Sequence, residues 1–346
     1  MRELTPAESR VIAGLLGSAA ASERERLRRI AVPRSTYHAA RRRAYAEGWL
    51  RDRYVPQPER IGFEAALVLA ARPFVERTEE LVDRWSRASS CVYLEAGSDL
   101  LLGVFVEPHS VDARTRSDQL LAGNLTSWHQ EIVADLHRPS IPVYFDYEGL
   151  WAHLSGVGGT VAYPRGLGGT SAAEGPPPLT PHQRWAVGEL LHRPFAPDAD
   201  AKEGHLVGPF GLPFSQQRMM ANGTISHRVF LNPAQVPPFQ GHAADQLVLV
   251  TGALKAGARP EVLFRTLTQE CRVFPFLFVV DGDRALLGAL GRAGLPGGES
   301  PEARRPVLPT LQEGLQGIEV TQVPAARART VVDHRYDRLL PVKVVP

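Results

Sequence analysis

The stretch LTPAESRVIAGLL, Leu4–Leu16, decides the architecture, because it returns as LTPHQRWAVGELL at Leu179–Leu191. Two further segments follow in the same order. ALVLAARP at Ala66–Pro73 returns as QLVLVTGA at Gln246–Ala253, and CVYLEAGSDLLLGVF returns in divergent form from Cys271 onward. The same order at a nearly constant interval indicates that the chain contains one unit twice, and a repeat of this kind determines the whole fold.

The composition is that of an ordinary globular protein. The 346 residues are 44% hydrophobic and 22% charged with a formal charge of +2, so no global attraction to nucleic acid or membranes follows. No long apolar stretch and no signal-peptide pattern occur, which predicts a cytoplasmic protein with no membrane partner. Cys91 and Cys271 hold matching places in the two copies, and we interpret both as buried apolar residues. No histidine has ligand spacing, so we predict no metal and no cofactor.

The first sixty residues predict a winged helix-turn-helix. Thr5 and Glu8 form a capping-box pattern at the start of one helix. A short second helix and a turn follow, and Ser35 is expected to cap a third helix that ends before Gly48. A short extended piece then runs over Trp49–Val55.

Arginine is the most frequent charged residue in this winged helix-turn-helix, which we call the first head. Between Glu23 and Arg53, ten arginines face four acidic residues. Guanidinium groups suit phosphate oxygens and the major-groove edge of guanine, so we predict that this head binds double-stranded DNA. The residues expected to meet bases are Arg34, Ser35, Thr36 and His38, and those expected to hold the phosphate backbone are Arg41, Arg42, Arg43, Arg51 and Arg53.

From Glu64 the pattern changes to β-α-β-β-α-β, which is the ferredoxin-like plan. The predicted helices are Thr78–Ser89 and Ala113–Ile132, and the predicted strands are Ala65–Ala71, Cys91–Glu95, Asp99–Val106, Ile132–Leu136 and Ile141–Phe145.

The second copy repeats the plan in weaker form. From Asp198 to Arg228, three acidic residues face three basic ones, and prolines and glycines shorten the third helix. We therefore predict a degenerate head, with a second DNA-reading head of different specificity as the alternative. The second ferredoxin-like unit is expected to finish with strands Ile318–Val323 and Thr330–Val332.

The predicted fold class is α+β, with two tandem copies of a winged helix-turn-helix followed by a ferredoxin-like βαββαβ domain. The expected boundaries are a first head at 1–60, a first ferredoxin-like domain at 61–152, a Gly/Pro linker at 153–178, a degenerate head at 179–240 and a second ferredoxin-like domain at 241–346.

The domain order and the segment EAGSDLLLGVFV, Glu95–Val106, resemble the Lrp/AsnC family of prokaryotic transcription regulators. The resemblance covers about residues 1–150 and matches at Gly97, Asp99 and Leu100–Leu102. It implies a DNA-binding regulator that forms a homo-oligomer, a dimer or higher, and that has no enzymatic activity. It also implies a small effector such as an amino acid, bound near Gly97, Ser98 and Asp99. A tandem chain is expected to form within itself the sheet pair that family members form between subunits.

Two alternatives stay open. Siroheme decarboxylases resemble the same architecture, pair two related subunits and use histidine and arginine near a bound tetrapyrrole. An architectural DNA-binding protein would need no effector. His334, in VVDHRYD, is interpreted as a surface or hydrogen-bonded histidine.

Overall fold

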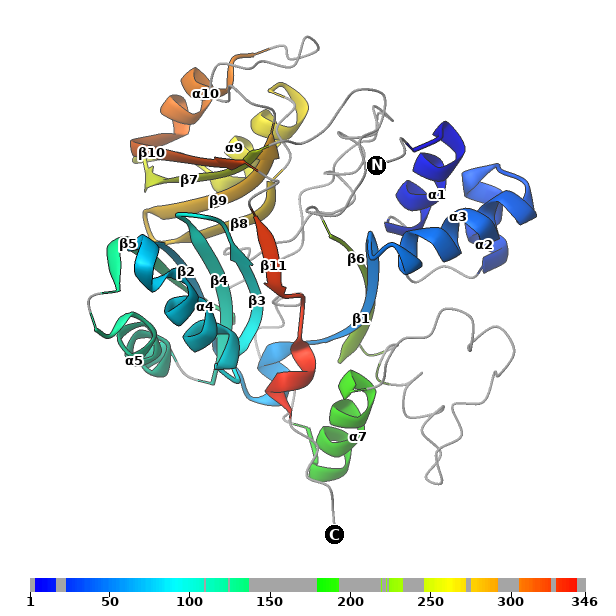
Figure 1. Cartoon of the computed structure of the whole chain (residues 1–346), viewed down its shortest axis with the longest axis horizontal. Coiled ribbons are helices and arrows are strands. Elements are labelled where there is room, and N and C mark those ends of the chain that lie inside the picture. Colours follow the sequence, from blue (N-terminus) through cyan, green and yellow to red (C-terminus); the bar gives the residue numbers. More distant parts are fainter. Residues whose placement is uncertain are drawn as a thin grey trace.

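The computed structural model describes residues 4–16, 23–108, 110–123, 125–136, 179–192, 219, 222, 224–232, 246–271, 275–291, 305–324 and 328–340. These residues form an α+β protein with two larger antiparallel sheets, a two-stranded ribbon and surrounding helices, which confirms the predicted fold class (Figure 1). The expected linker at 153–178, the expected strand Ile141–Phe145 and most of the second head lie outside the described residues. The domain boundaries therefore stay a prediction.

The first head consists of helices α1 (Pro6–Leu16), α2 (Glu23–Ile30) and α3 (Arg34–Ala46). The predicted capping box is present: the Glu8 amide donates to Thr5 Oγ1 at 3.2 Å, and the Thr5 amide donates to Glu8 Oε2 at 2.8 Å. Thr180 and Gln183 repeat both bonds, at 3.3 and 2.9 Å, before α7 (Pro181–His192). A capping box at the start of both helices supports the tandem repeat.

The predicted Ser35 cap was wrong. Helix α3 begins one residue earlier, at Arg34, and no side chain caps it. Pro33 is extended, with ψ 142°, and its carbonyl accepts the Tyr37 amide at 2.9 Å. Pro33 therefore takes the N-cap position, and Ser35 lies inside the first turn of the helix. Gly48 follows the helix with φ 72°, as predicted.

The first sheet has the ferredoxin-like connection. Its elements are β2 (Ala65–Pro73), α4 (Thr78–Arg87), β3 (Cys91–Ala96), β4 (Leu101–Glu107), α5 (Ser110–Leu121) and β5 (Thr126–Asp135), and short 3-10 turns precede β2 at Pro58–Ile61 and α4 at Val75–Arg77. The predicted helix Ala113–Ile132 was wrong in its second half. The helix ends at Leu121, Gly123 turns the chain with φ 97°, and β5 pairs with β2.

The second sheet repeats this connection. Its elements are β7 (Gln246–Leu254), α9 (Pro260–Gln269), β8 (Pro275–Asp281), β9 (Arg284–Gly291), α10 (Val307–Gly314) and β10 (Leu315–Pro324). The strand order is β10-β7-β9-β8, and the first sheet has the equivalent order β5-β2-β4-β3. The two copies therefore share one topology despite their divergent sequences.

The two sheets pack face to face. Along β2, Ala66 and Val68 share a core cluster with Leu277 and Val279 of the other sheet. The alternate residue Leu67 packs instead with Trp85 and the other residues that lie under α4 and α5. Because successive side chains of a strand point to opposite faces, each sheet buries one face against its own helices and the other against its repeat (Figure 1).

A two-stranded ribbon joins the two copies. Strand β1 (Leu50–Pro56) pairs antiparallel with β6 (Ile225–Leu231), and Arg53 lies directly opposite Arg228. These two residues are 175 positions apart, the interval that also separates Leu4 from Leu179. When equivalent residues of two copies pair with each other, the copies are related by an approximate two-fold axis. The chain therefore forms a dimer-like arrangement within itself.

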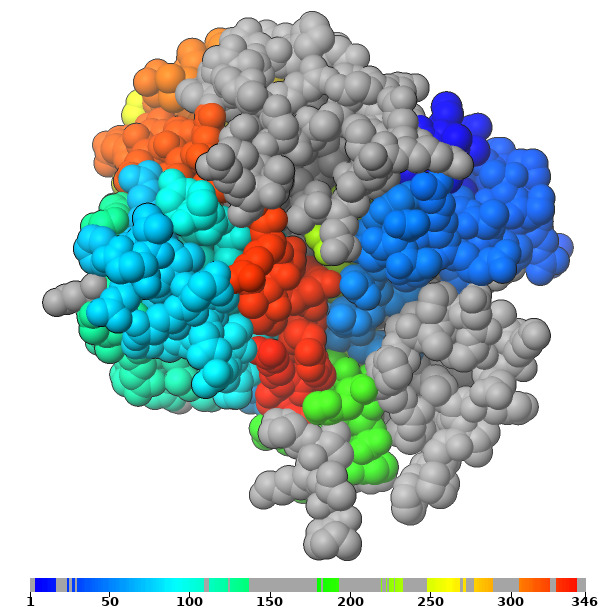
Figure 2. Space-filling model, viewed as in Figure 1, coloured from blue at the N-terminus to red at the C-terminus, as the bar shows by residue number. Residues whose placement is uncertain are grey.

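The C-terminal segment crosses to the first copy. Strand β11 (Arg329–Val332) pairs with β3 and extends the first sheet to the order β11-β3-β4-β2-β5. The prediction that Thr330–Val332 completes the second unit was wrong, because the open edge of β3 offers unpaired backbone groups. A 3-10 turn, η4 (Tyr336–Leu339), then follows. The space-filling view shows this segment in red between the cyan first sheet and the blue first head (Figure 2).

Candidate functional site

Helix α3 presents a cationic face. Arg34, Ser35 and Arg42 are exposed, and Thr36, His38 and Arg41 are half-buried. The Arg34 Nε donates to His38 Nε2 at 3.3 Å. The helix contains four arginines and no aspartate or glutamate. Its opposite side is anchored by the buried residues Tyr37, Ala40 and Ala44.

Arg43, Arg51 and Arg53, which we predicted to hold the phosphate backbone, contact other parts of the protein. Arg43 forms an ion pair with Glu8 of α1 at 2.9 Å, and its guanidinium lies 5.1 Å from the centre of the Trp49 ring. Arg51 lies 3.5 Å from the carboxylate of Asp333. Arg53 faces Arg228 across the ribbon and donates to the carbonyl of Asp52 at 3.2 Å. The exposed face of α3 and the arginines of β1 therefore have different surroundings: the β1 arginines contact the C-terminal segment and the ribbon.

A buried polar cluster lies where the C-terminal segment meets the ribbon. His334 is fully buried, has φ 48°, and stacks on Phe230 with ring centres 3.8 Å apart. Burial, together with the charges of Arg53 and Arg228, lowers the pKa of His334 well below its ordinary value. We predicted a surface or hydrogen-bonded histidine, and the burial of His334 excludes the surface position. The segment VVDHRYD gives no local sign of the distant ribbon that covers it.

Glu95 belongs to the same region. Its carboxylate accepts hydrogen bonds from Thr330 of β11 at 2.9 Å and from Tyr93 at 3.1 Å. Burial raises its pKa to about 7, and the two hydrogen bonds offset only part of that effect. Burial also raises the pKa of the neighbouring Asp333, against the charges of Arg53 and Arg51. Titratable groups thus gather at the junction of the two copies.

The predicted effector turn lies against the second copy. The Gly97 amide donates to the Leu100 carbonyl at 2.7 Å. A Cβ atom at Gly97 would lie 2.9 Å from Val323 of β10, while Ser98 and Asp99 are exposed. The turn therefore forms a tight contact between the sheets, and its role in effector binding stays a prediction.

Cys91 confirms the interpretation of the first cysteine. It is buried at the start of β3, and burial raises the pKa of its thiol to about 12. Cys271 is also buried. Within the described part of the chain, no group of three histidine, cysteine, aspartate or glutamate residues is placed to hold a metal ion. No helix in that part is long and apolar enough to cross a membrane.

Comparisons with known proteins support the tandem architecture. No protein-family model and no curated protein matches the chain. The solved structure of siroheme decarboxylase NirDL is similar over 96% of this chain and 97% of that chain, with a TM-score of 0.51 and 9% identity. The chain shares the fold of that enzyme.

Shorter matches concern single-unit proteins. AsnC from E. coli matches 38% of this chain and 93% of its own, with a TM-score of 0.29 and 9% identity. A transcriptional regulator from Neisseria meningitidis, solved with L-Met, matches 38% of this chain and 89% of its own, with a TM-score of 0.29 and 16% identity. All of these identities are low, and only the likeness to NirDL, with its TM-score of 0.51, supports the fold of this chain. The chemistry has to be argued from the residues of this chain.

The NirDL likeness corrects one prediction. We expected no enzymatic activity because the architecture resembled that of transcription regulators. However, the solved structure that matches nearly the whole chain is that of an enzyme. The inference from the resemblance to transcription regulators to an absence of enzymatic activity was therefore wrong.

Proposed function

We propose that the first head binds double-stranded DNA through the exposed face of α3. The observation that carries this proposal is a helix with four arginines and no carboxylate, of which Arg34 and Arg42 point to solvent. Exposed guanidinium groups bind phosphate oxygens and release counterions, which favours binding to nucleic acid. The neighbouring helix α2 adds the exposed Arg24 and Arg28.

The support of α3 makes this face suitable for recognition. Tyr37 is fully buried, and the Arg43–Glu8 ion pair ties α3 to α1. A recognition element that is rigid before binding loses less conformational entropy when it docks. We assign base contacts to Arg34, Ser35, Thr36 and His38 and phosphate contacts to Arg41 and Arg42, while Arg43, Arg51 and Arg53 support the head.

The test is a fluorescence-anisotropy titration with a labelled random-sequence duplex at several salt concentrations. We expect Arg41→Ala with Arg42→Ala to reduce the salt slope by about 1.8 and the affinity at 0.1 M salt by about 60-fold, if each residue neutralises one phosphate. The matched control removes two arginines from α4, Arg84→Ala with Arg87→Ala, and should leave both quantities unchanged. Equal losses in the two double variants would refute the assignment of the DNA face to α3.

Assembly and effector binding are further parts of this proposal. The internal sheet pair supplies one dimer-like unit per chain, and we propose that such units associate into a homo-oligomer. Sedimentation velocity tests this, since a monomer at micromolar concentration would contradict it. We also propose that an amino-acid effector binds beside Ser98 and Asp99. A titration with the twenty amino acids, monitored by the protein's thermal midpoint, would contradict this part if no midpoint moved.

A second candidate function is favoured by the full-length likeness to NirDL. We propose as this alternative that the chain acts on a tetrapyrrole, with the Arg53, Arg228 and His334 cluster at the junction of its two copies. His334 is fully buried, so this function requires the C-terminal segment to open. Addition of siroheme should then produce a shifted Soret band and, on incubation, a product lighter by carbon dioxide in mass spectrometry. An unchanged spectrum and mass would exclude this alternative.

A further inference from the structure

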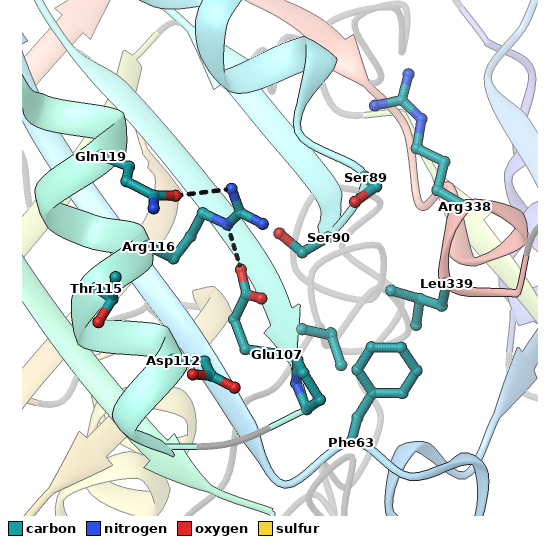
Figure 3. Close-up of a pocket in the computed structure, with 12 residues that line it drawn as sticks. Phe63, Ser89, Ser90, Glu107, Asp112, Thr115, Arg116, Gln119, Arg338 and Leu339 are labelled. Atoms are coloured by element: carbon teal, nitrogen blue, oxygen red, sulfur yellow. Dashed lines mark hydrogen bonds and ion pairs between the residues drawn. The ribbon is translucent and has the colours of Figure 1, made fainter.

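A cavity of about 410 Å³ lies at the end of β4, on the helix-covered side of the first sheet. Its walls come from both copies. The first copy contributes the end of β4, the turn before β3 and the first turns of α5, and the second contributes η4 through Arg338 and Leu339. The close-up shows Glu107 between α5 and the apolar side chains of Phe63 and Leu339 (Figure 3). This place is distinct from the α3 face and from the turn at Gly97.

The polar side of the cavity carries two carboxylates. Glu107 is 3% exposed, and Asp112 projects toward it from α5 (Figure 3). Burial raises the pKa of Glu107 and the charge of Asp112 raises it further, while Ser90 and Arg116 act in the opposite direction. Both carboxylates therefore belong to the lining of the same cavity.

Among the described residues that line the cavity, an arginine forms an ion pair with Glu107 and none forms one with Asp112. Arg116 Nε lies 3.2 Å from Glu107 Oε1, and its NH1 donates to Gln119 at 3.1 Å. The guanidinium of Arg338 turns away from the carboxylates and donates to the carbonyl of Ser86 (Figure 3). A positive group placed between Asp112 and the second oxygen of Glu107 would be attracted by both carboxylates.

The opposite side of the cavity is apolar. Phe63 and Leu339 lie across Glu107 from α5 (Figure 3), and Val106 and Pro108 add further apolar lining. A bare metal ion would find no third carboxylate, histidine or cysteine within the described residues, and it would gain nothing from the apolar wall. A ligand that joins a positive head to a compact apolar body matches both sides.

We propose that this cavity binds a small organic cation whose ammonium group lies between Glu107 and Asp112 and whose apolar body packs against Phe63 and Leu339. Because Leu339 belongs to η4, the bound cation would also contact the segment that carries β11. Occupation of the cavity therefore stabilises the attachment of the C-terminal segment to the first sheet.

The test uses three probes of nearly equal shape: benzylamine, benzyl alcohol and benzoate. Isothermal titration of the full chain should show that benzylamine binds at least about tenfold more tightly than benzyl alcohol, the ratio typical of one charge-assisted hydrogen bond. Benzoate should bind more weakly still. Equal affinity for the amine and the alcohol, or a preference for benzoate, would overturn the proposal.

Variants locate the site. Asp112→Asn should weaken benzylamine binding about tenfold and leave the affinity for benzyl alcohol unchanged. The matched control is Asp118→Asn, which removes an exposed carboxylate of the same helix that does not line the cavity, and it should leave benzylamine binding unchanged. Glu107→Gln provides a second test if it folds, while Asp112 is exposed and its substitution does not threaten folding. An unchanged affinity in Asp112→Asn, or an equal loss in Asp118→Asn, would refute the assignment.

Discussion

The buried carboxyl of Glu95 predicts how stability depends on pH. Its pKa is raised from an ordinary 4.5 to about 7, so the folded chain holds this proton in a pH range where the unfolded chain has lost it. The protonated Glu95 carboxyl therefore makes its full contribution to the free energy of unfolding below pH 4.5. This contribution decreases as the pH rises and is fully lost above pH 7. The pKa difference corresponds to a total cost of about 3 kcal/mol for an ionised Glu95.

Glu95→Gln removes this cost, because glutamine cannot ionise and still offers an oxygen to Thr330 and Tyr93. Urea unfolding of both proteins at pH 5 and pH 8 measures the effect. Since part of the cost is already present at pH 5, the stability of the variant relative to wild type should rise by about 2 to 3 kcal/mol between the two pH values. Amide hydrogen exchange in residues 328–336 should show the same trend, because these residues cover Glu95.

The control for this prediction is Glu79→Gln. Glu79 is exposed and pairs with Arg329 of the same strand, β11, at 2.7 Å, so its substitution removes a carboxylate from the same attachment without changing a buried group. We expect its stability relative to wild type to stay within about 0.5 kcal/mol over the pH range. A relative stability of Glu95→Gln that does not change with pH would refute the reasoning.

The remaining predictions concern the repeat and its contacts. Gly97→Ala should destabilise the chain by about 1 to 3 kcal/mol because its methyl group meets Val323 at 2.9 Å, and Val323→Ala in the same chain should restore part of the loss in urea unfolding. Thr5→Ala and Thr180→Ala should each cost about 1 kcal/mol, since each removes a capping-box hydroxyl, and a loss at only one of them would contradict equivalent helix starts. Cys91, with a thiol pKa of about 12, should resist a thiol reagent at pH 8 in the folded protein and react in urea, whereas fast reaction of the folded protein would show that β3 opens.

Local features of this protein were predictable from its sequence. The capping pattern at Thr5 and Glu8 depends on residues three apart, and the structure has the expected bonds. The ferredoxin-like order was predictable because strand alternation and helical spacing are also local. The α5–β5 boundary was missed because the apolar spacing from Ala113 to Trp128 also fits a helix, and Gly123 was not recognised as its end.

Contacts between the two copies were not predictable from local pattern. Thr330–Val332 has the alternation of a strand, but nothing in its sequence specifies whether its partner is the second sheet or the edge of β3. His334 becomes buried because the pairing of β11 with β3 places its ring against Phe230 of the ribbon. Likewise, the sequence gives no local sign of the ion pair between Arg51 and Asp333 at the same junction.

Selection of binding sites from random duplex DNA at near-physiological salt tests the proposed DNA binding most directly. We expect an enriched motif, and we expect it to be lost with Arg34→Ala and Arg42→Ala. Because each chain presents one arginine-rich head, a single chain should select an asymmetric site, and two associated chains should select a palindrome. If the protein retained no DNA in a salt-dependent manner, the proposal would be contradicted.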